Sequence, residues 1–345
     1  MKHFVIFVVL IFSLSYVFFL KRTEDSRGGS DSIRIFRVFG YSSFTGQWGP
    51  GPELKKIFEK DCQCKVEFVE GSDSGILLQR LSIEGESLGA DLVVGFDQFD
   101  LSKAQDQLQW KPMNLNLDLV ETLKNVEMNR YFVPYDWGVL TFVARRSDNL
   151  NIHNLDQLLD SSLAGQIALQ DPRTSSPGLQ FLNWVIKSKG EEEGFKFIRS
   201  MMKQAHSHSP SWSSAYGLFT NRQAKLVFSY VTSPIYHLIN EKDDNYVALE
   251  FSQGHPMQVE FVGIPNYCHN CDLSEKFINL MLSPEGQKII MQKNYMFPVI
   301  RGVKEGTEFD TIPKYPISVD LQIPNSKEIE SLLKKWAEIR RTEGL

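Results

Sequence analysis

The sequence has few cysteines, no excess of positive charge and no recognisable nucleotide-binding loop. Its 345 residues carry a formal net charge of −5, with charges of both signs interspersed, which argues against a nucleic-acid-binding surface. Neither a P-loop nor a dinucleotide-binding fingerprint occurs, and the standard loops for phosphate groups are therefore missing. Composition thus favours a globular protein without a nucleotide cofactor and without a nucleic-acid partner.

The four cysteines form two close pairs, Cys62 with Cys64 and Cys268 with Cys271. A zinc site would require both pairs to meet in space, and a C-x-C spacing is unusual for zinc. A redox C-x-x-C motif normally opens a helix, whereas residues 268–271 are expected to form a polar turn before one. We therefore favour two local disulfides, which form in an oxidising compartment outside the cytosol.

The N-terminus has the pattern of an export segment. Lys2 precedes an apolar run from Phe4 to Leu20, followed by a polar, Gly-rich linker, and residues 1–31 are assigned to this leader. As a helix the run would span about 25 Å, a little less than a bilayer core. No cleavage site is obvious and no cysteine follows to carry a lipid. An uncleaved N-terminal anchor therefore stays open, and either form would place the remaining chain in the periplasm.

From residue 33 the pattern alternates between strands and helices. Strand-like segments occur at 33–39, 65–69 and 90–96, and helical segments at 52–58 and about 74–85. A βαβαβ order predicts a mostly parallel, doubly wound sheet. The pattern restarts with strands at 166–170 and 225–230 and with helices at 177–187, at 191–202 and from about 233.

Two long β-rich stretches, 131–145 and 246–264, separate and follow these blocks, and helices are expected at 274–291 and 327–341. We predict an α/β fold of two lobes, each a mostly parallel sheet flanked by helices, joined by two crossing strands. Lobe 1 would comprise residues 32–134 and 255–315, and lobe 2 residues 135–254. The C-terminal segment 316–345 is expected to pack on lobe 2.

Ligands of open α/β sheets bind beyond the carboxyl ends of the strands, and the residues there form a coherent set. They offer aromatic faces, hydroxyl groups and a few carboxylates: Tyr41–Ser43, Trp48, Asp73, Ser74, Asp97, Arg173–Ser176, Ser211–Tyr216 and Tyr230–Ser233. Such a set suits a flat, positively charged ring, because ring faces attract cations and carboxylates neutralise their charge. Equally, each aromatic side chain could simply pack between elements.

No catalytic or metal-ligating set stands out. The segment Gly71-Ser72-Asp73-Ser74-Gly75 has an aspartate where a nucleophile elbow requires serine. His206 and His208 flank a serine, but that spacing alone is weak evidence for a metal, and we interpret them as solvated loop histidines. We assign no catalytic residue, no metal ligand and no cofactor.

At these residues the chain resembles the periplasmic thiamine-binding proteins of ABC importers. The resemblance extends from about residue 33 to 300. Its strongest segments are Tyr41–Phe44 with Trp48–Pro52, Asp61–Cys64, Phe132–Gly138, Gln170–Leu179, Trp212–Phe219, Ser229–His237 and Asp244–Tyr246. The family shares the Cys62/Cys64 pair, whereas Cys268/Cys271 lies outside the pattern.

The resemblance implies a type II periplasmic binding protein fold that closes on thiamine, or its phosphates, and delivers it to a membrane permease. By position, Tyr41, Trp48, Trp212 and Tyr236 would line the ring-binding cleft, and Asp73 would make a polar contact. The groups for the hydroxyethyl or phosphate end would be Ser74, Ser175 and Tyr230. This chain departs from the family at two positions: it has Ser74 where the family has glycine, and Tyr295 where the family has tryptophan. A monomer without a cofactor is expected, with hinges near Pro134 and Pro256.

Other functions on this fold stay open. Secreted thiamine-degrading transferases resemble it, but their mid-chain cysteine nucleophile has no counterpart between Cys64 and Cys268. Iron receptors commonly use neighbouring tyrosines, and no Tyr-Tyr pair occurs here. A polyamine receptor would need more cleft carboxylates than Asp73 and Asp97 provide.

Overall fold

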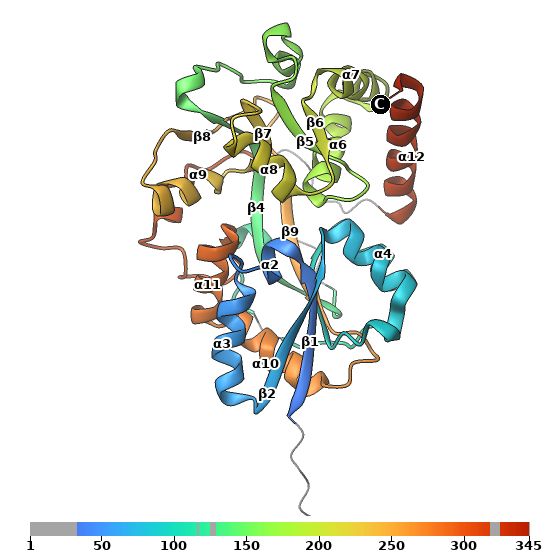
Figure 1. The fold of residues 1–345 in the computed structure, drawn as a ribbon, viewed down its shortest axis with the longest axis vertical. Coiled ribbons are helices and arrows are strands. Elements are labelled where there is room, and N and C mark those ends of the chain that lie inside the picture. The colour runs from blue at the N-terminus through green and yellow to red at the C-terminus, as the bar shows by residue number, and fades with distance from the viewer. Residues whose placement is uncertain (1–32, 116, 125–128, 318–324, 345) are drawn as a thin grey trace, which may run out of the picture.

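The computed structural model describes residues 33–115, 117–124, 129–317 and 325–344 (Figure 1). The leader predicted at residues 1–31 lies outside these ranges. Within them, no helix combines the length and apolar character that crossing a membrane requires.

The first lobe is built on three parallel strands. β1 (Arg34–Tyr41) lies between β2 (Cys64–Gly71) and β3 (Leu92–Asp97). The chain therefore runs from the central strand β1 to β2 on one side and then to β3 on the other side. Every residue of β3 is buried, as expected for an apolar strand covered on both faces. The helices of this part are α2 (Ser42–Thr45), α3 (Gly51–Asp61), α4 (Ser74–Glu84) and α5 (Leu101–Gln107).

The second lobe repeats the arrangement. β5 (Ile167–Gln170) pairs in parallel with β6 (Ser207–Ser209) and with β7 (Leu226–Tyr230). Its helices are α6 (Ser176–Lys189), α7 (Glu191–Gln204), α8 (Trp212–Thr220) and α9 (Ser233–Tyr236), the last continued by a π-helical turn at His237–Glu241. Both sheets therefore present the carboxyl ends of parallel strands as loops.

Two long strands join the lobes. β4 (Phe132–Arg145) and β9 (Met257–Gly263) are antiparallel to each other; β9 also pairs with β3, and β4 with β7. Figure 1 shows both strands running between the two halves of the molecule. Shorter strands, β8 (Tyr246–Ala248) and β10 (Phe297–Pro298), pair with β4. The predicted two-lobe α/β class is confirmed.

Each lobe has its own hydrophobic core. Phe36, Phe96 and Phe277 belong to the first core, and Trp184 and Phe228 to the second. The C-terminal helix α12 (Ser326–Glu343) adds Trp336 and Ile339 to the second core. Met296, which follows the last long helix of the first lobe, also packs in the second core. The lobe boundaries expected from the sequence stay predictions.

The single helix predicted at 274–291 is wrong. The structure has α10 (Cys271–Leu282) and α11 (Pro284–Asn294), separated at Ser283. The Ser283 hydroxyl accepts a hydrogen bond from the Gly286 amide, 3.0 Å away, and Pro284 occupies the first turn of α11. A serine cap followed by proline starts a new helix instead of extending the old one.

Both cysteine pairs form disulfides, as expected. However, α10 begins at Cys271, three residues earlier than predicted, so the second cysteine lies within the first helical turn. The β-rich stretch 246–264 is likewise divided into β8 and β9, and only β9 crosses between the lobes. The solvated-loop interpretation was also wrong for His208, which lies in β6 beside Trp336, where burial lowers its pKa to about 4.

Candidate ligand-binding site

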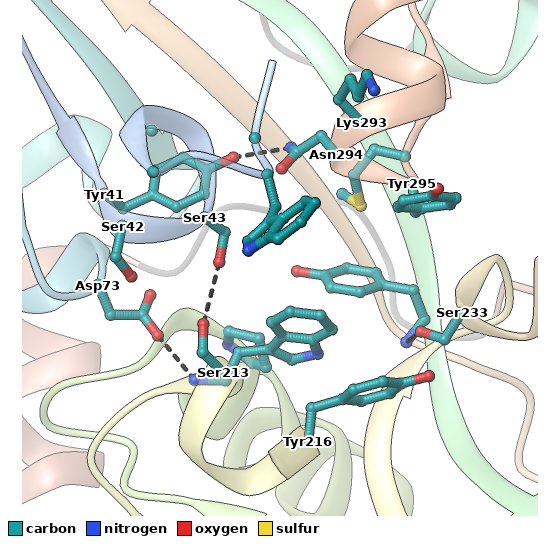
Figure 2. A pocket seen from close by; sticks show the side chains of 18 of the residues that line it. Tyr41, Ser42, Ser43, Asp73, Ser213, Tyr216, Ser233, Lys293, Asn294 and Tyr295 are labelled. Carbon is teal, nitrogen blue, oxygen red and sulfur yellow. Dashed lines mark hydrogen bonds between the residues drawn. The ribbon is translucent and has the colours of Figure 1, made fainter. Parts of the chain in front are cut away.

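A cavity of about 670 Å³ opens between the lobes (Figure 2). Of the residues assigned to the cleft by the family resemblance, all except Ser175 line it: Tyr41, Trp48, Asp73, Ser74, Trp212, Tyr230, Tyr236 and Tyr295. Asp97, Arg173 and Thr174 of the wider predicted set are not among the lining residues. Ser175 is buried behind the wall as the residue before α6, and its neighbour Ser176 takes the lining position. The structure thus brings segments from both lobes to one cavity.

One wall of the cavity is a stacked pair of rings on α8. Trp212 and Tyr216 are four residues apart, on one face of the helix, and their ring centroids lie 4.8 Å apart at 22°. The Trp212 indole donates to the Ser229 hydroxyl at 2.9 Å, and the Tyr216 hydroxyl is 2.9 Å from His237 Nε2. Both rings are therefore held in place before any ligand arrives.

Tyr41 and Trp48 belong to the opposite side. A Cβ atom on Gly95 would lie 2.1 Å from the Tyr41 ring, so the ring occupies space that only glycine leaves free. Trp48 stands in the loop after α2 with 85% of its surface exposed. An indole so exposed at the rim of a cavity is free to close over a bound ring.

Asp73 connects the two lobes at the cleft. Its carboxylate accepts from the Ser74 amide at 2.8 Å and from the Trp212 amide of the other lobe at 3.1 Å, so it caps α4 and also binds the first amide of α8, whose own cap is Ser211. Burial raises its pKa to about 6, although these two amides oppose the shift. Ser43 and Ser213 also meet across the cleft at 3.2 Å, and both contacts are visible in Figure 2.

The floor of the cavity comes from the crossing strands. Glu260 of β9 lies 7% exposed and accepts hydrogen bonds from the hydroxyls of Tyr41 at 2.6 Å and Tyr135 at 2.7 Å. Gln258, two residues earlier on the same face, donates to Glu260 at 3.0 Å. The site therefore combines aromatic walls with an acidic floor.

The far side holds Tyr236, Tyr295 and Asn294. The Tyr236 and Tyr295 rings meet edge to face at 5.2 Å, and Asn240 donates to the Tyr295 hydroxyl at 2.6 Å. Asn294 donates to the Tyr41 hydroxyl at 2.8 Å, which ties the end of α11 to the first strand. Tyrosine at 295 thus keeps an aromatic ring where the family resemblance expected tryptophan.

Sequence reasoning missed several lining residues: Gln258, Glu260, Asn294, Lys293, Glu241 and Met296. Tyr216 belonged to the predicted segment Ser211–Tyr216 and does line the cavity. Glu260 interrupts the apolar segment 257–263, and a charge in a strand buried along its whole length is a signal for function. The residues at the end of α11 gave no comparable signal.

The comparisons with known proteins agree on one family. The family model of bacterial extracellular solute-binding proteins matches residues 88–331. Thiamine-binding periplasmic proteins are similar along most of the chain: that of Brucella suis is 36% identical over 311 residues, with 89% of this chain and 90% of the relative covered. That of Escherichia coli K12 is 38% identical over 266 residues, with 77% and 81% covered.

Solved structures agree. A periplasmic thiamin binding protein superimposes with a TM-score of 0.82 at 34% identity, covering 90% of this chain and 98% of that one. A ferric binding protein from Campylobacter jejuni shares the fold with a TM-score of 0.71 at 19% identity, over 88% and 99% of the two chains. The chain belongs to the bacterial extracellular solute-binding proteins, in the family of the thiamine-binding periplasmic proteins.

Proposed function

We propose that this chain is a periplasmic receptor that binds thiamine in the interlobe cavity and delivers it to the permease of an ABC importer. The observation that carries the proposal is the stacked Trp212–Tyr216 pair on one lobe, facing the cavity that Tyr41 and Trp48 line from the other. Thiamine consists of two flat rings, one with a permanent positive charge. Relatives named for thiamine binding support the same ligand.

The physical chemistry of the cavity fits this ligand. Each aromatic face contributes about 0.5–2 kcal/mol of cation–π attraction, depending on how completely water is excluded. Asp73 and Glu260 place carboxyl groups at the cleft and at the floor, where they favour a positive charge. A volume of about 670 Å³ lies within the range of pockets for small ligands.

The hydroxyethyl or phosphate end would lie near Ser74 and Ser176, where α4 and α6 begin. Helix N-termini favour anionic groups because their first amides are unpaired and the helix dipole is positive there. Both serines line the cavity and their hydroxyls are hydrogen-bonded to each other. Tyr230 completes this part of the lining, and Ser175 supports it from behind.

A competition titration tests the ligand. Purified protein is titrated with thiamine, thiamine monophosphate, thiamine diphosphate, ferric ion and spermidine, with tryptophan fluorescence and calorimetry as readouts. We expect thiamine or one of its phosphates to bind most tightly and to change the emission of Trp48 and Trp212. Thiamine binding weaker than millimolar would contradict the proposal, and tight ferric ion binding would favour an iron receptor.

We further propose that the chain is not an enzyme. A thiamine-degrading transferase on this fold would use a cleft cysteine, but the four cysteines form two disulfides and none of them lines the cavity. Incubation with thiamine and a nucleophilic base tests this directly, because steady base exchange would establish turnover.

We also propose that the protein is a monomer exported to the periplasm through its N-terminal segment. Sequencing the N-terminus of the mature protein distinguishes a cleaved signal from a retained anchor. Sedimentation analysis of the soluble part tests the monomer.

A further inference from the structure

Two buried carboxyl groups face each other beneath the cavity. Asp136 of β4 and Glu260 of β9 are direct partners in the antiparallel pairing of the crossing strands. Asp136 is 0% exposed and Glu260 7%. Among the residues that the structure describes, neither has a lysine or arginine as an ion-pair partner. Two carboxyl groups in such a place are costly, because burial and mutual repulsion both disfavour the charged forms.

Neutral donors surround the pair. Tyr41 and Tyr135 donate to Glu260 Oε2, and Gln258 donates to Oε1. Asn294 donates to Asp136 at 2.7 Å, with the same amide group that reaches the Tyr41 hydroxyl. This hydrogen-bond network extends from the crossing strands β4 and β9 to Tyr41 in the aromatic wall, and it fixes the orientation of the acceptor atoms.

Some acceptors remain unused. Gln258 is only 2% exposed and lines the cavity, yet no donor in the described part of the chain reaches its Oε1 atom. The Asp136 Oδ1 atom likewise finds no donor there. A buried acceptor without a donor is unfavourable, so a ligand N–H group that reaches Gln258 Oε1 from the cavity satisfies an unpaired atom, whereas Asp136 Oδ1 lies behind the lining.

The protonation of Asp136 and Glu260 supports the same kind of ligand, one that donates hydrogen bonds. Burial, followed by repulsion from Glu260, raises the pKa of Asp136 well above its usual range, and burial also raises the pKa of Glu260. A pair that keeps one proton offers both an acid hydrogen and carboxylate oxygens. That combination matches a ring nitrogen beside an amino group.

We propose that Gln258 and Glu260, with Asp136 behind Glu260, form a specificity-determining floor that selects ligands with an amino group on a flat nitrogen heterocycle. The inference rests on the proposed thiamine function, for which the aminopyrimidine ring would occupy the floor. The thiazolium ring has no N–H group and cannot donate to Gln258. The hydroxyl of thiamine is lost on phosphorylation, whereas the amino group is retained in every phosphate.

The test compares thiamine with oxythiamine, in which an oxygen replaces the pyrimidine amino group. Calorimetry on the unmodified protein is expected to give at least a tenfold preference for thiamine, about 1.4 kcal/mol. Equal affinities would overturn the inference without any variant. If thiamine itself does not bind, the proposed function fails instead, and the two failures are thus distinguished.

Two variants then locate the preference. Glu260→Gln keeps the shape of the side chain but removes its charge, and Gln258→Met removes the amide at nearly the same length. Each is expected to reduce the thiamine preference to below threefold. Glu275→Gln, an exposed site on α10 outside the cavity, is the matched control and should keep the full preference.

Melting curves establish which variants fold. If Glu260→Gln does not fold, Gln258→Met alone decides, since Gln258 loses only one hydrogen bond to a neighbour. A folded variant that keeps the tenfold preference would show that this floor stabilises the hinge and does not select the ligand.

Discussion

Trp212 shows how a single residue joins the local and the long-range structure of the site. Its ring stacks on Tyr216, its indole is fixed by Ser229, and its backbone amide donates to Asp73 of the other lobe. The same residue therefore lines the cavity and takes part in the contact between lobes.

Replacing Trp212 with alanine should weaken thiamine binding at least tenfold, about 1.4 kcal/mol, because the stacking face is lost while the backbone contact to Asp73 remains. Calorimetric titration measures the change. Trp212→Phe keeps a flat ring and should give an intermediate affinity. An alanine variant with unchanged affinity would show that this tryptophan only packs against Tyr216.

Thiamine affinity should rise between pH 5 and pH 7 through Asp73. Burial raises the pKa of this carboxyl to about 6, so the fold favours its protonated form, and its contribution to stability is lost as pH rises through 6. Binding has the opposite sign, because the cation favours the ionised carboxylate. In Asp73→Asn, calorimetry at pH 5, 6 and 7 should show a flatter rise and about tenfold weaker binding at pH 7.

Comparing the variant with the unmodified protein isolates the effect of Asp73. Burial also raises the pKa of Asp97 to about 6, but Asp97 is present in both proteins. The same pH dependence in both proteins would assign the effect to another group.

At the scale of elements, the most informative one is α12. Its Trp336 is 2% exposed, and the guanidinium groups of Arg173 and Arg340 lie over the ring at 4.9 and 5.5 Å. Both arginines also pair with Asp171 after β5, at 2.6 and 2.9 Å. The N-terminal end of the helix reaches the other lobe, where Ser326 and Ser102 of α5 are 2.9 Å apart. The helix thus contacts both lobes.

Trp336→Ala should lower the free energy of unfolding by about 3 kcal/mol or more, because a large buried ring is removed and both arginines lose their aromatic partner. Urea denaturation followed by circular dichroism measures the loss. Lys334→Ala on the exposed face of α12 is the control and should stay within about 0.5 kcal/mol. A similar small effect for Trp336→Ala would mean that α12 is not integral to the second core.

At the scale of the whole molecule, β4 and β9 are the strands that connect the lobes. Across the opening, Asp73 contacts the Trp212 amide and Ser43 contacts Ser213. These contacts describe a cleft whose walls touch. We expect closure around a ligand to involve small changes in the chain near Pro134 and Pro256, the hinge positions predicted from the sequence.

Thiamine at a hundredfold excess over its Kd should raise the free energy of unfolding by about 2.7 kcal/mol, because it binds only the folded protein. The midpoint of thermal unfolding should rise accordingly, and the radius of gyration from solution scattering should fall as the lobes close. Under the same conditions Trp212→Ala should show a smaller stabilisation. Stabilisation without any compaction would contradict closure by lobe movement.

Much of the site was predictable because it lies where strands end. Tyr41 ends β1, Tyr230 ends β7, and Asp73 and Ser74 lie in the connection from β2 to α4 and at the start of that helix. Alternation of apolar strands and amphipathic helices places such positions at one edge of each sheet, independently of how the lobes meet. At Ser175 the prediction from the sequence was one residue off, because Ser176, the first residue of α6, lines the cavity in its place.

The two-lobe fold, the disulfide pairs and the aromatic character of the cleft could be predicted from the sequence, because they depend on local periodicity and on short contiguous segments. The floor of the cavity became visible only in the folded structure. Gln258 and Glu260 lie within a strand that reads as core, and Asp136 and Asn294 meet Tyr41 from distant parts of the chain. Their function arises from the pairing of β4 with β9 and from the packing of α11, which no local pattern encodes.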